Sequence, residues 1–262
     1  MANRYSALIE AVFLRHFTSN DQSFEFGREE LVEIATSEGL AVPKNLGDAI
    51  YSFRYRSDLP DAIRAKAPSG HEWIIEGAGR ARYRFRCVPV ARIEPRAELL
   101  AIKIPDATPE IIGANALGDE QALLARVRYN RLIDLFLGIT AFSLQNHLRT
   151  TVEGIGQIEI DEIYVGVDRT GRQFVVPVQA KGGSDRHGVV QSSQDFACCA
   201  QKFPNLICRA VSAQFMAGER IALFELTLSD GQVKVVDEKH YVLSPSTEIS
   251  VDDLRAYALR TT

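Results

Sequence analysis

Residues 154–183, GIGQIEIDEIYVGVDRTGRQFVVPVQAKGG, constrain the fold of this chain more than any other stretch. Two runs that are rich in β-branched residues flank the tetrapeptide DRTG, which is typical of a turn. The sequence therefore predicts an antiparallel β-hairpin whose second strand ends at two glycines. Because side chains alternate along a strand, Gln179 and Lys181 share one face at that end, and Asp161 can lie beside them on the neighbouring strand.

The composition is that of an ordinary globular protein. The chain has 262 residues, of which 46% are hydrophobic and 24% charged, enough for one large domain or two modest ones. No apolar run reaches membrane-spanning length and the N-terminal stretch is amphipathic, so we expect no membrane segment, no signal peptide and a cytoplasmic protein. The four cysteines form no CxxC pair and predict neither a zinc site nor a disulfide framework. The sequence has no P-loop, so we expect no nucleotide cofactor.

Three sections divide the chain. Residues 1–90 predict a small domain, residues 91–118 contain three prolines and predict a linker with short pieces of structure, and residues 119–262 predict a larger domain. In the first section, hydrophobic periodicity and turn residues predict three helices and two strands, at 5–17, 26–40, 45–56, 71–79 and 80–90.

The third section combines helical and strand patterns and predicts an α/β fold. A long helical stretch covers 119–149, with a break near Gly138, and directly precedes the hairpin. A second helix follows at 189–203, and strands follow at 206–216 and 220–228. We expect Asp195, in the middle of the second helix, to have a structural role, and His187 to be an exposed loop residue.

A stripe of arginines marks the predicted strand 80–90. In RARYRFR, four arginines alternate with apolar or aromatic residues and are expected to share one strand face: Arg80, Arg82, Arg84 and Arg86. Guanidinium groups in a row suit phosphate, so the stripe is a candidate nucleic-acid contact. The alternative is a solvated strand face that is neutralised by Glu72 and Glu76 on the partner strand.

Three helices followed by a hairpin resemble a winged-helix domain, and the resemblance covers residues 1–90. It rests on the order of the elements and not on a motif. In winged helices the third helix usually enters the major groove of DNA. The resemblance therefore implies a DNA-binding, winged-helix-like α+β domain, with Tyr51, Arg54, Tyr55 and Arg56 near the duplex.

The order Asp161 … Gln179-Ala180-Lys181 resembles the motif of the PD-(D/E)XK nuclease superfamily, which includes many type II restriction endonucleases. The resemblance covers about residues 120–230. It implies a restriction-endonuclease-like core, in which helices flank a central mixed sheet. It also implies a Mg²⁺ ion, or Mn²⁺ as a substitute, held by Asp161, Gln179 and the Ala180 carbonyl, with Lys181 positioning the attacking water.

The chain departs from this pattern at two positions. Ile160 stands where the family often has proline, and Gln179 replaces the acidic residue, which removes one negative charge from the site. Three alternatives follow. A further carboxylate contributes, with Glu159 nearest and Glu153 next; metal binding is weaker; or the site is inactive. Apart from the resemblance, a strand end with a solvated aspartate and a snorkelling lysine also fits these residues.

Together these features predict a metal-dependent endonuclease of double-stranded DNA, most simply a type II restriction enzyme. Cutting two strands requires two sites, so we expect a homodimer. The alternatives are a Holliday-junction resolvase or repair nuclease of the same fold, and a non-catalytic winged-helix DNA-binding regulator with a degraded site. The net charge of −4 argues against a generally basic surface, but it leaves room for a local basic patch.

Overall fold

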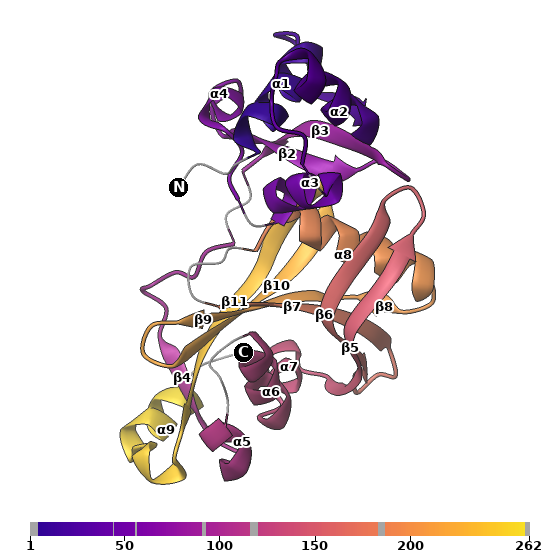
Figure 1. The fold of residues 1–262 in the computed structure, drawn as a ribbon. Coiled ribbons are helices and arrows are strands. Elements are labelled where there is room, and N and C mark those ends of the chain that lie inside the picture. Colours follow the sequence, from indigo (N-terminus) through magenta and orange to yellow (C-terminus); the bar gives the residue numbers. More distant parts are fainter. Residues whose placement is uncertain are drawn as a thin grey trace.

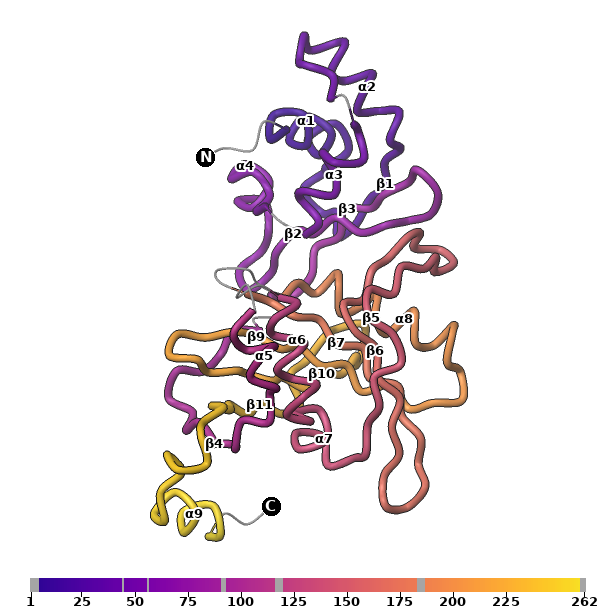
Figure 2. The backbone as a smooth tube through the Cα atoms, turned by 60° about the horizontal axis from the view of Figure 1, so that its bottom comes forward, coloured from indigo at the N-terminus to yellow at the C-terminus, as the bar shows by residue number. Residues whose placement is uncertain are grey.

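The computed structural model describes residues 5–43, 45–55, 57–90, 93–115, 120–182 and 187–259. The chain forms two units, one above the other in Figure 1, and the backbone trace in Figure 2 shows the same division. The smaller, N-terminal unit contains a three-stranded sheet, and the larger unit contains an eight-stranded sheet.

The N-terminal unit contains all the helices and strands that the sequence predicts for residues 1–90. It adds strand β1 and the short helix α4, which the sequence patterns do not reveal. The elements are α1 (Ser6–His16), β1 (Ser23–Gly27), α2 (Arg28–Ser37), α3 (Leu46–Tyr55), α4 (Asp61–Arg64), β2 (His71–Gly77) and β3 (Arg82–Pro89). The sheet is antiparallel, in the order β1-β3-β2.

An aromatic cluster forms the core of this unit. The Phe13 ring on α1 stacks on that of Phe17 at a centroid distance of 4.9 Å. Its edge contacts with Trp73 on β2 and Phe85 on β3 have centroid distances of 5.1 Å. Such pairs add to the stabilisation that comes from burying the rings. The cluster therefore joins the first helix to both strands of the hairpin.

The sheet of the larger unit is mixed. Its strands are β4 (Ala101–Pro105), β5 (Thr140–Val152), β6 (Gly156–Val167), β7 (Gln173–Lys181), β8 (Ile207–Cys208), β9 (Ala210–Met216), β10 (Arg220–Ser229) and β11 (Gln232–Ser244). Their order is β4-β11-β10-β9-β7-β6-β5, with β8 also paired to β7. Strand β7 is parallel to β8 and β9, and β4 is parallel to β11, whereas the other neighbours are antiparallel.

Helices cover both faces of this sheet. They are α5 (Glu110–Asn115), α6 (Glu120–Tyr129), α7 (Leu132–Leu137), α8 (Val189–Lys202) and α9 (Val251–Ala258), with a 3-10 turn η1 (Ser246–Glu248) before α9. Helix α8 lies on the face toward the N-terminal unit, and α6 and α7 lie on the opposite face (Figure 1). The α/β prediction is confirmed as a mixed sheet flanked by helices. In the described part of the chain, no helix is both long and apolar enough to cross a membrane.

The hairpin that the sequence predicts is present as β6 and β7. In its turn, the Asp168 carboxylate accepts hydrogen bonds from the backbone N–H groups of Thr170 (2.8 Å) and Arg172 (3.1 Å). Gly171 has φ +84°, a conformation that side chains with a Cβ rarely adopt. The DRTG segment thus forms the turn because its aspartate holds the backbone and its glycine reverses it.

The prediction of a helical stretch over residues 119–149, with a break near Gly138, is wrong beyond Gly138. Helix α7 ends at Gly138, which has a left-handed conformation, and the chain continues as strand β5. Most side chains of β5 are exposed, so the segment shows no clear alternation of apolar and polar residues. Pairing with β6 along nearly its whole length, and not local propensity, makes it a strand.

The predicted linker contributes to the larger unit. Strand β4 pairs with β11 at the edge of the eight-stranded sheet. Upstream of β4, Arg96 donates to the buried Glu238 carboxylate through its backbone N–H (2.8 Å) and its Nε (2.7 Å). Residues 101–105 of the 91–118 segment are therefore part of the larger unit's sheet, and the segment is not only a spacer.

The two units are in direct contact. Tyr55, at the end of α3, donates its hydroxyl to the side chain of Gln194 on α8 at 3.0 Å. Gly77, at the end of β2, lies against the turn between β5 and β6, where an added Cβ would be 2.1 Å from the Ile155 carbonyl oxygen. Only a glycine fits there, so the residue allows the backbones of the two units to approach each other.

Candidate functional site

The candidate site lies where the β6–β7 hairpin opens. The pairing of β6 with β7 begins where Val167 faces Gln173 and stops where Glu162 faces Val178. Beyond that point β7 continues beside β9 as far as Lys181. Asp161 follows the last pair and bridges the gap, because its Oδ2 accepts the backbone N–H of Ala180 at 2.9 Å. The carboxylate thus satisfies a backbone donor that the hairpin ladder leaves unpaired.

Gln179 and Lys181 lie on the same face of β7, as the sequence predicts. Their neighbours Val178 and Ala180 belong to the core with α6 and α7, so Gln179 and Lys181 leave the strand on the other face, where the Gln179 amide contacts α8. The Gln179 side chain is 1% exposed. The side chain of Lys181 is 12% exposed, and its Nζ lies 3.9 Å from Oε1 of Glu120 at the start of α6. The three motif side chains therefore gather at one end of the hairpin.

Helix α8 adds a carboxylate, that of Asp195, for which the sequence predicts only a structural role. Asp195 is 2% exposed, and both of its carboxylate oxygens lie 3.1 Å from Nε2 of Gln179. The helical spacing carried a signal for this position. Asp195 precedes the buried Cys198 and Cys199 by three and four residues, which places an aspartate on the apolar face of α8 toward the sheet.

The electrostatics of the site are those of buried carboxylates next to one lysine. Burial raises the pKa of Asp161, while the Ala180 N–H and the Lys181 charge oppose the shift. Burial raises the pKa of Asp195 far above its usual range. The hydrogen bond from Gln179 opposes this shift, the charge of Asp161 adds to it, and the charge of Lys181 opposes it. Each carboxylate therefore gains from any cation that comes close to both.

Glu159 was expected to be the further carboxylate near the metal. Its carboxylate lies beside Arg149 (3.3 Å) and His147 (3.5 Å) on β5. Glu159 contacts Gln179 through its backbone carbonyl, which accepts a hydrogen bond from Nε2 of Gln179 at 3.2 Å. The Glu159 charge also raises the pKa of Asp161, so it is near the site. The carboxylate that contacts Gln179 directly is that of Asp195.

The donor atoms suit a hard cation such as Mg²⁺, which prefers oxygen ligands. Oε1 of Gln179 is buried and has no hydrogen-bond partner among the described residues, so it is an acceptor that a cation would satisfy. In that part of the chain, no three His, Cys, Asp or Glu side chains gather as a metal-binding group. A metal ion here would therefore need amide or carbonyl oxygens in addition to carboxylates, as the Asp161, Gln179 and Ala180 set provides.

The arginine stripe is shorter than predicted. Strand β3 begins at Arg82, and Ala81 has φ +58°, so the alternation does not extend to Arg80 and the expectation that all four arginines share one strand face is wrong. Arg82, Arg84 and Arg86 do alternate. Their charges are paired with Glu25 on β1 and Glu76 on β2, at distances of 2.6 to 3.3 Å: Arg82–Glu25, Arg84–Glu25, Arg84–Glu76 and Arg86–Glu76.

Arg84 and Arg86 thus lie on a strand face that acidic side chains neutralise, which is the alternative to a nucleic-acid contact. The sequence predicts Glu76 as such a partner but does not predict Glu25. Arg82 retains a side chain that is 62% exposed, so it is the member of the stripe most available to an external anion.

The third helix of the N-terminal unit faces the larger unit. Atoms Nε and Nη2 of Arg54 are buried without a hydrogen-bond partner among the described residues, and the guanidinium lies 4.8 Å from the centre of the Tyr55 ring. Tyr55 itself contacts Gln194 of α8. Tyr51 is exposed. The predicted DNA contact Arg56 lies outside the described residues. Presentation of Arg54 and Tyr55 to DNA would therefore require the two units to separate.

A cavity of about 740 Å³ lies between the units. Its lining includes Arg54 and Trp73 from the N-terminal unit, His187 just before α8, and Gln191 in the first turn of α8. His187 was expected to be exposed but is 4% exposed, and its Nε2 lies 2.6 Å from the Ser192 hydroxyl. Burial, and then the Lys181 charge, lower the pKa of its imidazole to about 3. The cavity is therefore linked to the site through His187, which lines it and lies close enough to Lys181 for that charge to act on its imidazole.

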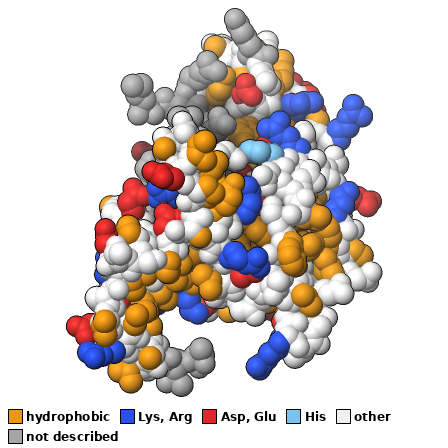
Figure 3. Space-filling view, turned by 90° about the horizontal axis from the view of Figure 1, so that it is seen from below, with side chains coloured by type: hydrophobic (Ala, Val, Ile, Leu, Met, Phe, Trp, Pro, Cys, Tyr) orange, Lys and Arg blue, Asp and Glu red, His pale blue; other side chains and the backbone are white. Residues whose placement is uncertain are grey.

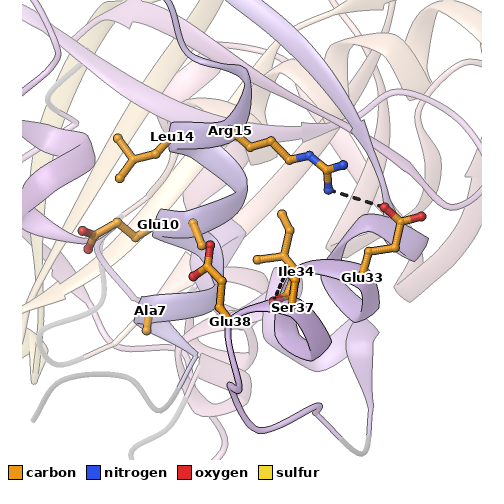
Figure 4. Close-up of a pocket in the computed structure, with 9 residues that line it drawn as sticks. Ala7, Glu10, Leu14, Arg15, Glu33, Ile34, Ser37 and Glu38 are labelled. Atoms are coloured by element: carbon orange, nitrogen blue, oxygen red, sulfur yellow. Dashed lines mark hydrogen bonds and ion pairs between the residues drawn. The ribbon is translucent and has the colours of Figure 1, made fainter.

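A second hollow lies within the N-terminal unit, between α1 and α2. Figure 4 shows Arg15 reaching across it to Glu33, with an Nη1–Oε2 distance of 3.4 Å. Its volume is about 800 Å³, and its lining carries the further carboxylates Glu10 and Glu38. All of its lining residues belong to α1, α2 and the residue after α2, so it takes no part in the site around Asp161.

Comparisons with known protein families, with curated proteins and with solved structures find no match to this chain.

Proposed function

We propose that this protein is a metal-dependent endonuclease of double-stranded DNA, related to the PD-(D/E)XK nucleases and most like a type II restriction enzyme. One observation carries the proposal. Asp161, Gln179 and Lys181 converge where the β6–β7 hairpin opens, in the order and strand positions of that motif. Further support comes from the mixed sheet with helices on both faces, which fits a restriction-endonuclease-like core.

The chemistry follows from the side chains. A bound Mg²⁺ or Mn²⁺ ion would neutralise phosphate oxygens and lower the pKa of a water molecule. Asp161 and Oε1 of Gln179 would hold it, together with the Ala180 carbonyl. The Lys181 ammonium would orient the attacking water and stabilise the negative charge that develops on the phosphorus oxygens. The largely buried position of Lys181 strengthens that interaction, because screening by solvent is weaker there.

The N-terminal unit is proposed to bind duplex DNA as a winged-helix-like domain. The order of its helices and its antiparallel sheet support this part of the proposal. Tyr51 and Arg82 are exposed and are the first candidates for contact with DNA. Arg80, a residue that precedes β3 in the chain, is the third candidate. Arg54 would join them only when α3 leaves α8. DNA binding is therefore proposed to require movement between the two units.

A homodimer is part of the proposal, because cutting both strands requires two sites. Hydrophobic side chains spread across the face that Figure 3 shows from below. Helices α5, α7 and α9 lie at this end of the molecule and carry exposed Ile111, Leu135, Val251 and Leu254 (Figure 1). Exposed apolar surface of this kind is typical of protein contacts and supports association with a second copy.

The proposal is tested by digesting plasmid and phage DNA with the wild-type protein, with and without Mg²⁺ or Mn²⁺. The matched variants are Lys181→Ala and Lys234→Ala, the latter an exposed lysine on β11. We expect discrete fragments that need metal, at a rate that Lys181→Ala lowers by at least about a hundredfold, equivalent to about 2.7 kcal/mol of activation free energy. Lys234→Ala should cut like the wild type. DNA that stays intact under all these conditions would overturn the proposal.

Two alternatives remain as outcomes of the same test. The amide at position 179 favours a non-catalytic DNA-binding regulator, which would bind the duplex at every metal concentration and leave it uncut. A resolvase or repair nuclease would cut four-way junctions or damaged duplexes in preference to plasmid, and would give no discrete fragments from phage DNA. A gel-shift assay and a junction substrate, run beside the digestion, separate these outcomes.

A further inference from the structure

Asp195 is a buried carboxylate without a cationic partner. It is 2% exposed, its hydrogen-bond donor is the amide of Gln179, and no lysine, arginine or histidine in the described part of the chain forms an ion pair with it. Burial of an ionised carboxylate is unfavourable unless a positive charge compensates it. The position therefore needs either a proton or a cation.

The orientation of the Gln179 amide is fixed by its neighbours. Nε2 donates to the Glu159 carbonyl at 3.2 Å and to both oxygens of Asp195 at 3.1 Å. Turning the amide over would bring Oε1 against these same acceptors. Oε1 must therefore remain on the other side, where it is buried and has no partner among the described residues. The structure thus leaves one buried oxygen acceptor free on the side chain whose Nε2 binds Asp195, and Asp161 is close enough for its charge to act on Asp195.

We propose that Asp195 supplies the second carboxylate of the cation site, and that residue 179 is a glutamine because Asp195 faces it. This inference rests on the proposed function. A glutamate at position 179 would place an anionic oxygen about where Nε2 now lies, against the Asp195 carboxylate and the Glu159 carbonyl. With glutamine, the amide binds Asp195 and the site still contains two carboxylates. The acidic group has moved from strand β7 to helix α8, and the site keeps its charge.

This arrangement differs from a degraded site in a specific way. In a degraded site, Gln179 removes a charge that nothing replaces, and Asp195 is a protonated structural residue. In the proposed site, positions 179 and 195 depend on each other, so exchanging their functional groups should restore what either single change destroys.

The test measures Mn²⁺ binding by the whole protein without DNA, by isothermal titration calorimetry at pH 7.5. The variants are Asp195→Asn, Gln179→Glu and the double variant Q179E/D195N, with Asp252→Asn on the exposed start of α9 as the control. We expect Asp195→Asn to weaken Mn²⁺ binding at least tenfold, Gln179→Glu to be destabilised by the facing carboxylates, and the double variant to bind within about threefold of the wild type. Asp252→Asn should bind normally. Circular dichroism verifies that each variant is folded.

The outcomes separate this inference from the proposed function. If Asp195→Asn folds and binds Mn²⁺ like the wild type, or if the double variant binds no better than Asp195→Asn, the inference is overturned, whether or not the wild type cuts DNA. If Mn²⁺ binding follows the expected pattern and DNA is never cut, the cation site stands and the nuclease proposal fails. A wild-type protein that binds no Mn²⁺ would contradict the inference directly.

Discussion

Acidification should destabilise this protein through one histidine, His187. The residue is 4% exposed and lies just before α8, and its Nδ1 has no hydrogen-bond partner among the described residues. Burial, and then the Lys181 charge, lower its pKa from 6.5 to about 3. The N-terminal end of a helix also disfavours a positive charge. The folded protein therefore keeps this imidazole neutral at pH values where the unfolded chain binds a proton.

The sign and size of the effect follow from proton linkage. Between pH 6.5 and about 3 the unfolded state binds more protons at this position than the folded state, so the free energy of unfolding falls as the pH falls. One pKa unit corresponds to about 1.4 kcal/mol. At pH 5, about 1.5 units below the pKa in the unfolded state, the loss from His187 is about 2 kcal/mol.

Urea unfolding followed by circular dichroism at pH 7 and pH 5 tests this prediction. The variants are His187→Gln, whose amide can still bond Ser192, and His71→Gln, which removes an exposed histidine. Between pH 7 and pH 5 the wild type should lose about 2 kcal/mol more than His187→Gln, and His71→Gln should follow the wild type. An equal loss in the wild type and His187→Gln would refute the assignment of His187 as a buried neutral group.

Two further predictions concern stability. Arg128→Ala should lower the free energy of unfolding by about 3 to 5 kcal/mol, because it removes the charged partner, at 2.8 Å, of the fully buried Glu162 carboxylate and leaves the Ser143 hydroxyl as a neutral donor. A loss below about 1 kcal/mol in thermal unfolding would contradict this. Gly77→Ala should weaken the contact between the units by about 1 to 3 kcal/mol, since its Cβ would overlap the Ile155 carbonyl. The control Gly113→Ala, at an open position on α5, should be neutral or stabilising. Equal effects of the two variants in urea unfolding would contradict the close approach at Gly77.

The sequence predicts the hairpin because local signals agree there. Both strands are rich in β-branched residues, and the aspartate and glycine of DRTG match the turn that they form. The convergence of Asp161, Gln179 and Lys181 follows from that hairpin and from the alternation of side chains along a strand. The sequence predicts helices α1, α2 and α3 of the N-terminal unit equally well, since apolar residues recur there at helical spacing.

What could not be predicted depends on contacts between distant segments. The sequence predicts a helix where β5 lies, because the strand forms through pairing with β6 and not through the propensity of its own residues. The pairing of Glu25 with Arg84 requires β1 to lie beside β3, and the sequence gives no sign of β1. Asp195 contacts Gln179 only because α8 packs on the sheet, and its spacing from Cys198 and Cys199 is the one local sign of this contact.

The most direct test of the central claim is the rate of Mg²⁺-dependent DNA cleavage by Asp161→Asn. Asparagine keeps an oxygen that can accept the Ala180 N–H and removes only the charge, so the fold should survive. The control is Asp230→Asn, in the exposed turn between β10 and β11, where asparagine tolerates the φ of +55°. If Asp161 holds the metal, its variant should cut at least about a hundredfold more slowly, while the control cuts normally. Cleavage by Asp161→Asn at the wild-type rate would contradict the account.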